Sequence, residues 1–385
     1  MDISEKLKKL PPYLFAELDR KKEEVKKRGI DVISLGIGDP DLPTPEEIVK
    51  ALYEAALDPS NHRYPSYEGM LILREKFAEW FKKRFGVKLD PEKEVITLIG
   101  SKEGIAHLPL GIINREEYVL IPDPGYPVYY ASTIFADGYP FFMPLFKSNN
   151  FLPDLSSIPE EIVKKTKLMF INYPNNPTSA IAPISFLKEV VEFALAHGII
   201  IASDAAYSEI FWNEKPHSIL EVEGAMECAI EFHSLSKTFN MTGWRIGFAA
   251  GNRNIVNALL KVKTNVDSGV FQAIQYAGIK ALEIYERVSL QNREIYKKRR
   301  EIFLKGIEKL GLNAHPSDAT FYVWVECPKG MSSMEMAERC LEKGVVITPG
   351  IGFGKYGEGF VRVALTVSEE KIEEACKRIE EAFKN

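Results

Sequence analysis

The chain has 385 residues, of which 45% are hydrophobic and 27% are charged, and its formal net charge is -5. This length allows one large hydrophobic core and a smaller companion domain, whereas a mildly acidic chain without a basic block is a poor partner for nucleic acid or an anionic membrane. The longest apolar runs are only strand-sized and the amino end is charged, so the sequence predicts no membrane segment and no export, and we expect a cytoplasmic protein that acts on small molecules.

The cysteines and histidines show no spacing typical of a metal site or a disulfide framework. Four cysteines are scattered without C-x-x-C spacing, and six histidines lack a pairing such as H-E-x-x-H. We therefore expect no bound metal and interpret these residues as structural or surface groups.

Apolar segments of strand length alternate with segments of helix length through the middle of the chain. Such alternation predicts an α/β domain, in which parallel strands are joined by right-handed crossovers. From about Ile279 a long, charged and periodic segment predicts a helix that leaves this domain, followed by shorter strands and a C-terminal helix that form a small α+β domain. The predicted strands lie near 95–99, 118–122, 167–172, 198–203, 228–233 and 245–250 in the large domain, and over 321–326, 345–348 and 360–365 in the small one.

The segment from Phe232 to Thr238 closes one of the predicted strands with a lysine, Lys237. Serines at Ser234 and Ser236 precede it, and Arg245 follows eight residues later. A lysine amine beside hydroxyl and guanidinium donors suits an aldehyde cofactor that carries a phosphate, as pyridoxal phosphate does. A solvated lysine in a polar loop is the competing interpretation of this motif taken alone.

Polar residues also follow three other predicted strands. Asp204 ends the strand near 198–203, either as a cap for the next helix or as the acid that keeps a pyridine nitrogen protonated. Asn176 lies in a proline-rich turn and could offer its amide to a phenolic oxygen. At Gly100 and Ser101 a strand runs into a helix start whose free N–H groups favour phosphate, although no P-loop pattern is present.

Taken in order, these motifs resemble those of pyridoxal-phosphate-dependent aminotransferases of class I/II, in the fold type I superfamily. The resemblance covers nearly the whole chain and is specific because its motifs occur in the family's order. It implies a large cofactor domain over 46–278 with a mainly parallel sheet, and a discontinuous small domain of 1–45 with 279–385. The matching segments are 35–41, 64–65, 68–69, 122–127, 175–178, 234–237, 243–247 and 360–363.

The resemblance also implies a role for each matching residue. Lys237 would be the Schiff-base lysine and the acid/base that moves the proton, with Asp204 and Tyr207 completing the catalytic group. The cofactor, pyridoxal 5'-phosphate, would be contacted by Ser101, Lys102, Tyr126, Asn176, Asp204, Tyr207, Ser234, Ser236, Lys237 and Arg245, and by Tyr64 of a neighbouring subunit in a homodimer.

A narrower similarity concerns the substrate. The segments 64–70, 100–107 and 349–354 resemble LL-diaminopimelate aminotransferases, which implies transfer of an amino group between LL-diaminopimelate, through tetrahydrodipicolinate, and 2-oxoglutarate in lysine biosynthesis. In this family an arginine at the place of Arg362 grips the substrate carboxylate, for which its planar fork is suited. The chain departs from some members at Tyr67, where they have an acid. The implied substrate-binding residues are Tyr13, Gly38, Lys102, Asn176, Asn265 and Arg362.

Three other functions remain open at this point. A broad aspartate, alanine or glutamate aminotransferase would share the cofactor residues, and so would a carbon–sulfur β-lyase of the same fold. A regulator that binds the cofactor without turnover is the non-catalytic alternative.

Overall fold

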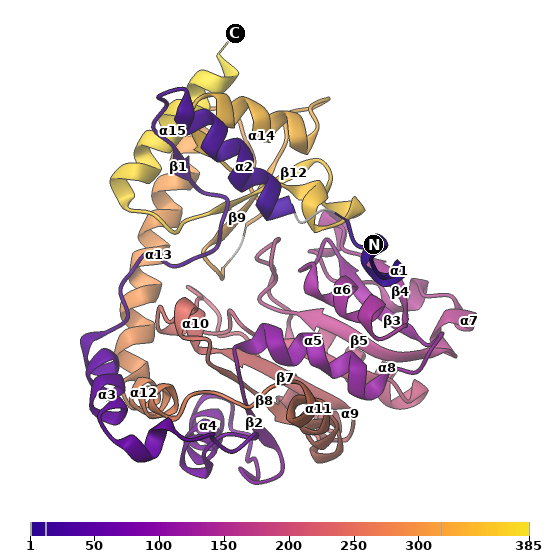
Figure 1. Ribbon diagram of the computed structural model, residues 1–385. Helices are drawn as coiled ribbons and strands as arrows, with labels where there is room; N and C mark the ends of the chain where they lie inside the picture. The colour runs from indigo at the N-terminus through magenta and orange to yellow at the C-terminus, as the bar shows by residue number, and fades with distance from the viewer. Residues whose placement is uncertain (1, 12–13, 317, 385) are drawn as a thin grey trace.

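The structure, a computed structural model, describes residues 2–11, 14–316 and 318–384. Two layers of structure are stacked in Figure 1, with a large sheet and its helices below and a smaller group of strands and helices above. Among the described helices, none has the length and apolar character that crossing a bilayer requires.

A seven-stranded sheet forms the centre of the large domain, in the order β2-β8-β7-β6-β5-β3-β4. Strands β3 to β7 pair in parallel, as the alternating pattern predicts, but β8 is antiparallel to both β2 and β7. The expectation of parallel pairing was wrong for β8, because the connection from β7 contains only single helical turns instead of a full crossover helix. The strands are β2 (Val95–Leu98), β3 (Tyr118–Asp123), β4 (Tyr139–Pro144), β5 (Thr166–Asn172), β6 (Ile200–Asp204), β7 (Ala229–Ser234) and β8 (Gly247–Gly251).

Helices cover both faces of this sheet. On one face apolar side chains of α5 (Ser101–Ile112), α6 (Val128–Phe135) and α11 (Arg253–Val266) pack against the strands. On the other face lie α4 (Leu71–Phe85), α8 (Ile184–His197) and α12 (Gln272–Glu283), with α3 (Glu46–Ala56) beside α12. A sheet buried on both faces explains why its strands have continuous apolar sequences instead of alternating ones. Two short helices, α7 (Glu160–Val163) and α9 (Ala225–Cys228), complete this part of the chain.

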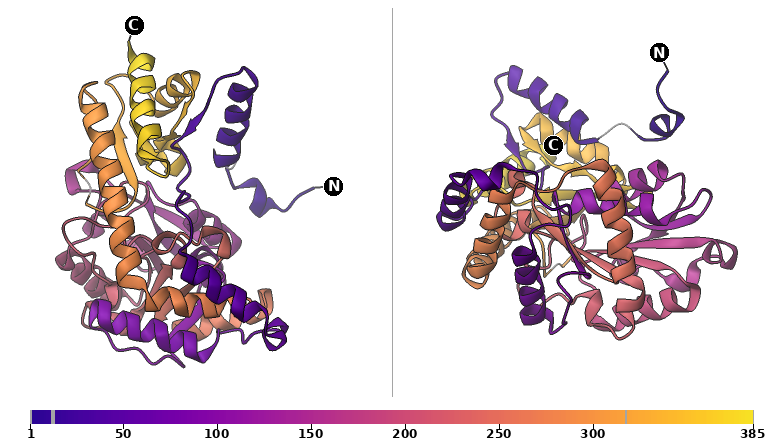
Figure 2. Two further views of the ribbon diagram at one scale, coloured as in Figure 1. Left: turned by 90° about the vertical axis from the view of Figure 1, so that its left-hand side faces the viewer. Right: turned by 60° about the horizontal axis from the view of Figure 1, so that its bottom comes forward.

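The small domain is built around the antiparallel sheet β11-β12-β9 and the parallel pair β1-β10. Its core is a separate hydrophobic cluster between these strands and the helices α13, α14 and α15. Strand β1 comes from the amino-terminal part of the chain yet lies among the carboxyl-terminal elements (Figure 2), which supports our proposal of a discontinuous small domain. The proposed bound at residue 278 falls inside α12. The elements are α1 (Glu5–Lys8), α2 (Leu14–Lys27), β1 (Ile33–Ser34), α13 (Tyr285–Glu308), β9 (Tyr322–Glu326), α14 (Ser333–Glu342), β10 (Val345–Val346), β11 (Thr348–Pro349), β12 (Phe360–Ala364) and α15 (Glu369–Phe383).

The helix that joins the two domains, α13, begins later than the sequence indicated. Ile279 lies inside α12, and the backbone leaves the helical conformation at Ile284 before α13 starts at Tyr285. The apolar periodicity continues across this break without a glycine or proline, so the pattern merged two helices into one. Figure 2 shows α13 running from the large sheet to the small domain.

The carboxyl ends of the parallel strands define where a ligand can bind. Strands β5, β6 and β7 end at Asn172, Asp204 and Ser234, on the edge of the sheet that faces the small domain. Ligands in open α/β sheets bind outside this edge. The fold therefore directs the polar residues singled out in the sequence toward the space between the two domains.

Candidate active site

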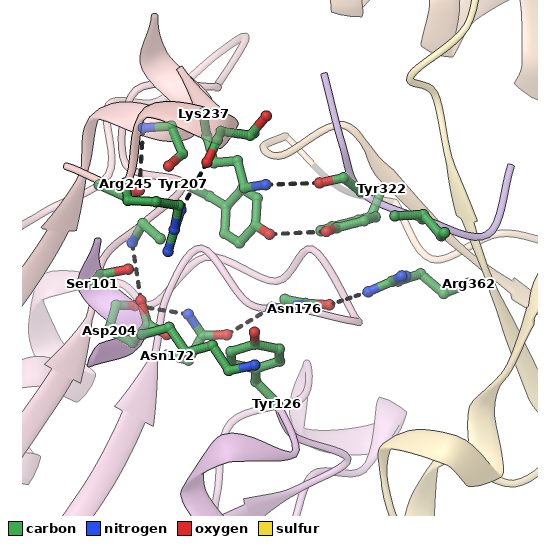
Figure 3. Close-up of a pocket in the computed structure, with 17 residues that line it drawn as sticks. Ser101, Tyr126, Asn172, Asn176, Asp204, Tyr207, Lys237, Arg245, Tyr322 and Arg362 are labelled. Atoms are coloured by element: carbon green, nitrogen blue, oxygen red, sulfur yellow. Dashed lines mark hydrogen bonds between the residues drawn. The ribbon is translucent and has the colours of Figure 1, made fainter. Parts of the chain in front are cut away.

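Lys237 lies on a single helical turn, α10 (Leu235–Thr238), directly after β7. Its Nζ donates a hydrogen bond to the carbonyl oxygen of Gly38 at 2.7 Å (Figure 3). Burial lowers the pKa of Lys237 to about 8, and the nearby Arg362 and Arg245 act in the same direction. Because a neutral amine is the nucleophilic form, this environment makes Lys237 reactive near neutral pH in a way that an exposed lysine is not.

Asp204 ends β6 and is buried at the floor of the cavity. One carboxylate oxygen accepts a hydrogen bond from the hydroxyl of Tyr129 at 2.7 Å, and the other accepts from the backbone N–H of Ala206 at 3.2 Å. Burial raises the pKa of Asp204, and these two donors only partly oppose that shift. A buried carboxylate of this kind favours a cationic partner, which a protonated pyridine nitrogen would provide.

The start of α5 and the loop around Arg245 bring several anion-binding groups together. Arg245 has a left-handed backbone with φ of 55°, and its guanidinium lies so close to the helix start that a Cβ at Gly100 would be 2.3 Å from its Nη2. Burial and the charge of Arg245 lower the pKa of Lys102. Such close placement of cations and helix N–H groups fits a phosphate dianion, which would relieve their mutual repulsion.

The turns after β5 and β6 line the middle of the cavity. Asn172 accepts a hydrogen bond from the backbone N–H of Asn176 at 2.8 Å and donates one to the backbone carbonyl of Asp204 at 2.7 Å. Asn172 thus fixes the turn that carries Asn176 relative to the floor of the site. Tyr126 and Tyr207 also line this space, so an aromatic ring bound above Asp204 would meet both stacking and hydrogen-bonding groups.

Arg362 enters the cavity from strand β12 of the small domain and is 2% exposed. Its guanidinium donates to the side-chain oxygen of Asn176 at 2.8 Å and to the carbonyl of Gly36 at 2.7 Å. The cation also lies 4.3 Å from the centre of the Tyr322 ring. A planar donor held this firmly by protein groups is suited to bidentate binding of a carboxylate.

The cavity formed by these groups has a volume of about 280 Å³ and opens between the two domains. Tyr64 and Asn265 do not line it: Tyr64 is 87% exposed and Asn265 is also exposed. Tyr13 lies outside the described residues. The sequence-predicted residues that do line the cavity are Gly38, Ser101, Lys102, Tyr126, Asn176, Asp204, Tyr207, Ser234, Ser236, Lys237, Arg245 and Arg362.

Three residues in or beside the cavity were missed by sequence reasoning. Asn172 ends a predicted strand, so the same strand-end argument that selected Asp204 could have found it. Tyr129 follows Tyr126 by one helical turn, but only the fold reveals its hydrogen bond to Asp204. Tyr322 lies in a strand of the small domain, and nothing in its local sequence points to the cavity.

One cluster of potential metal ligands lies outside this cavity. Glu103, His107 and Asp267 place ligand-type atoms within 4.8 Å of one another. The buried ammonium of Lys263 is 2.8 Å from Asp267 and 3.4 Å from Glu103, so a positive charge is already present among these groups. This arrangement is that of a buried ion-pair network and gives no reason to propose a metal.

The donor set matches pyridoxal phosphate part by part, with an amine for the aldehyde, an acid for the ring nitrogen and a cationic cradle for the phosphate. The fold and the site together define a fold type I enzyme that uses pyridoxal phosphate. Residues 30–379 match the family described as aminotransferase class I and II, and the chain belongs to this family. It is therefore a pyridoxal-phosphate-dependent transferase whose substrates are amino acids and oxo acids.

Curated relatives and solved structures agree with this assignment. An LL-diaminopimelate aminotransferase of Aquifex aeolicus is 56% identical over 380 residues, and one of Halothermothrix orenii is 53% identical over 381 residues; each alignment covers 98% of both chains. The substrate-bound structure of BacF from Bacillus subtilis is 38% identical, with a TM-score of 0.95 over 99% of this chain and 98% of that one.

Proposed function

We propose that this chain transfers an amino group between LL-2,6-diaminopimelate, through tetrahydrodipicolinate, and 2-oxoglutarate, as a step of lysine biosynthesis. The observation that carries the proposal is the 56% identity to an enzyme of that name over 98% of both chains. The cavity supports it further, because Arg362 and Lys102 both line the cavity and could bind a substrate that has carboxylates at both ends.

Each residue of the cavity has a role that depends on the part of the cofactor or substrate it would contact. Pyridoxal phosphate, when bound, supplies an aldehyde that takes up the amino group and a ring that withdraws electrons from the substrate. Arg362 orients the substrate carboxylate, and Asp204 stabilises positive charge on the ring nitrogen. Lys237 moves a proton at the α-carbon, for which a pKa of about 8 is well matched to neutral pH.

Tyr126 would stack on the ring, while Asn176 and Tyr207 would hold its phenolic oxygen. The phosphate would be held by Ser101, Lys102, Ser234, Ser236 and Arg245, which line the cavity.

We also propose a homodimer in which each active site is completed by the other subunit. Tyr64 is largely exposed in the single chain, although the family pattern gives it a phosphate contact. Asn265 and Tyr13 would also reach the substrate at this junction, Asn265 from the second chain. Tyr53 and Leu57, which precede Tyr64 in the chain, are also exposed apolar side chains, and exposed apolar groups of this kind support a protein contact.

A mixing experiment tests the shared site. Tyr64→Ala and Lys237→Ala chains are each purified, mixed, dissociated and allowed to reassociate. If Tyr64 acts across the interface, a mixed dimer contains one site with both residues intact and regains activity that neither parent has. Mixtures that stay as inactive as their parents, while forming mixed dimers, would show that Tyr64 acts within its own chain or not at all.

We place this reaction in the cytoplasm. All four cysteines of the chain are free thiols, which suits a reducing compartment. The chain can be fused in its native host to a reporter that forms a disulfide in oxidising compartments. Recovery of the reporter in its oxidised form would contradict a cytoplasmic location.

The substrate is tested by a half-reaction without an acceptor. The loaded enzyme is mixed separately with LL-diaminopimelate, aspartate, alanine and glutamate, and the conversion of the cofactor from its aldehyde to its amine form is followed by absorbance. We expect LL-diaminopimelate to react at least about tenfold faster than aspartate and alanine, the ratio that one additional charged contact provides. Glutamate should also react, because it is the amino acid formed from 2-oxoglutarate. Equal or faster conversion with aspartate or alanine would indicate a broad aminotransferase, and pyruvate released from cystathionine would indicate a β-lyase.

A further inference from the structure

Tyr322 is a residue of the small domain that touches three parts of the site. It lies on β9, is 3% exposed, and its hydroxyl is 2.9 Å from the hydroxyl of Tyr207 (Figure 3). Its ring lies beneath the guanidinium of Arg362 at 4.3 Å. Its hydroxyl also lies over Gly38, where a Cβ would be only 1.8 Å from that oxygen.

The hydrogen bond between the two tyrosines has a direction that the chemistry of the site determines. Each phenol carries one proton, so Tyr207 cannot donate both to Tyr322 and to a ligand. When Tyr207 donates to the phenolic oxygen of the bound cofactor, the proton between the two tyrosines must come from Tyr322. A phenol that accepts a hydrogen bond becomes a stronger donor in turn.

We propose that Tyr322 is a positioning residue that orients the hydroxyl of Tyr207 toward the cofactor and supports the guanidinium of Arg362 with its ring. Tyr322 thereby links the group that faces the cofactor to the group that faces the substrate carboxylate. The inference rests on the proposed binding of the cofactor and not on the identity of the amino-acid substrate. A failure of the LL-diaminopimelate assignment would therefore leave it unchanged.

The test uses the pH at which the visible absorption of the loaded enzyme changes, because this midpoint reports how strongly the phenolic oxygen holds a shared proton. In Tyr322→Phe the donation by Tyr207 weakens, the oxygen holds the proton more firmly, and the midpoint rises by about 0.5–1 pH unit, as expected for one neutral hydrogen bond. Other groups facing this part of the cavity are unchanged in that variant; they are Asp39, Tyr126, Asp204, Lys237, Arg245 and Arg362.

A comparison of Tyr322→Phe with Tyr322→Leu separates the role of the hydroxyl from that of the ring. Tyr322→Phe keeps the ring under Arg362 and leaves the KM for amino acids within about twofold, whereas Tyr322→Leu removes the ring and raises KM by about tenfold, as for loss of a buried cation–π contact. The matched control is Tyr296→Phe, in the same aromatic cluster, whose hydroxyl has no hydrogen-bond partner among the described residues. This control keeps the wild-type midpoint.

A double variant makes the outcome decisive. In a Tyr207→Phe background, Tyr322→Phe adds no further shift, because the hydroxyl it acts through is already absent. An unchanged midpoint in Tyr322→Phe, or equal shifts with and without Tyr207, would overturn the proposal and reduce Tyr322 to a packing residue.

Discussion

The segment that carries Gly36 and Gly38 is anchored by an ion pair between Asp41 and Arg299 of α13. Arg299 donates to both carboxylate oxygens of Asp41, at 2.6 and 2.8 Å, and also to the carbonyl of Leu365 at 3.1 Å. The Arg299 side chain is 5% exposed and that of Asp41 31%. Because the Asp41→Asn variant would leave a buried guanidinium facing a neutral amide, we expect a loss of about 2 kcal/mol in unfolding free energy, between the costs of breaking an exposed and a fully buried pair.

The assay is chemical denaturation of Asp41→Asn beside a matched control, Glu47→Gln. Glu47 of α3 pairs with Arg287, which lies on α13 as Arg299 does. These side chains are 51% and 48% exposed, so the control should lose no more than about 0.5 kcal/mol in unfolding free energy. High salt should abolish the control's effect and leave most of the Asp41 effect. Equal losses in the two variants would refute the idea that Arg299 anchors this segment through a buried bond.

Three other predictions concern the site. Arg362→Lys should raise the KM for the amino acid by about 10- to 100-fold, because a point charge replaces a bidentate fork, and a wild-type KM in steady-state assays would contradict that role. Gly38→Ala should lower kcat/KM by at least about tenfold, because its Cβ meets Tyr322 at 1.8 Å, while Gly243→Ala, with no atom within 4 Å, should behave as wild type. The rate of covalent loading of the cofactor-free enzyme with pyridoxal phosphate should rise with pH to a midpoint near 8, since burial lowers the pKa of Lys237 and more neutral amine forms as pH rises; a midpoint near 10 would contradict the burial argument.

The large domain could be predicted from sequence because most of its strands are short apolar runs, and several of them end in a polar residue. Asp204 was placed at a strand end by this rule, and the structure puts it at the same edge of the sheet as Ser234, which was singled out as a neighbour of Lys237. The same rule gave no direction for β8, since strand direction depends on the connection and not on the strand itself. Strand β4 escaped notice because Pro140 and Pro144 make it atypical, although prolines are tolerated on an edge strand.

The residues of the candidate site also fall into those that the sequence could identify and those that it could not. Residues adjacent to a recognisable motif, such as Lys237 and Arg245, could be identified from the sequence and its family resemblance. Tyr322 could not, because it reaches the cavity only through the packing of β9 against β12. Tyr64 is the opposite case, because the sequence resemblance assigns it a contact that a single chain does not show. Tyr64 is exposed in the single chain, and its proposed contact requires a second copy.

Covalent attachment of the cofactor to Lys237 underlies every role proposed for the other residues of the cavity. The loaded enzyme is reduced with borohydride, digested and mapped by mass spectrometry. We expect a reduced pyridoxyl group on the peptide that contains Lys237 and none on the peptide that contains Lys102, which also lines the cavity. A label on Lys102 or elsewhere, or no label on a protein that had taken up the cofactor, would show that Lys237 is not the attachment point.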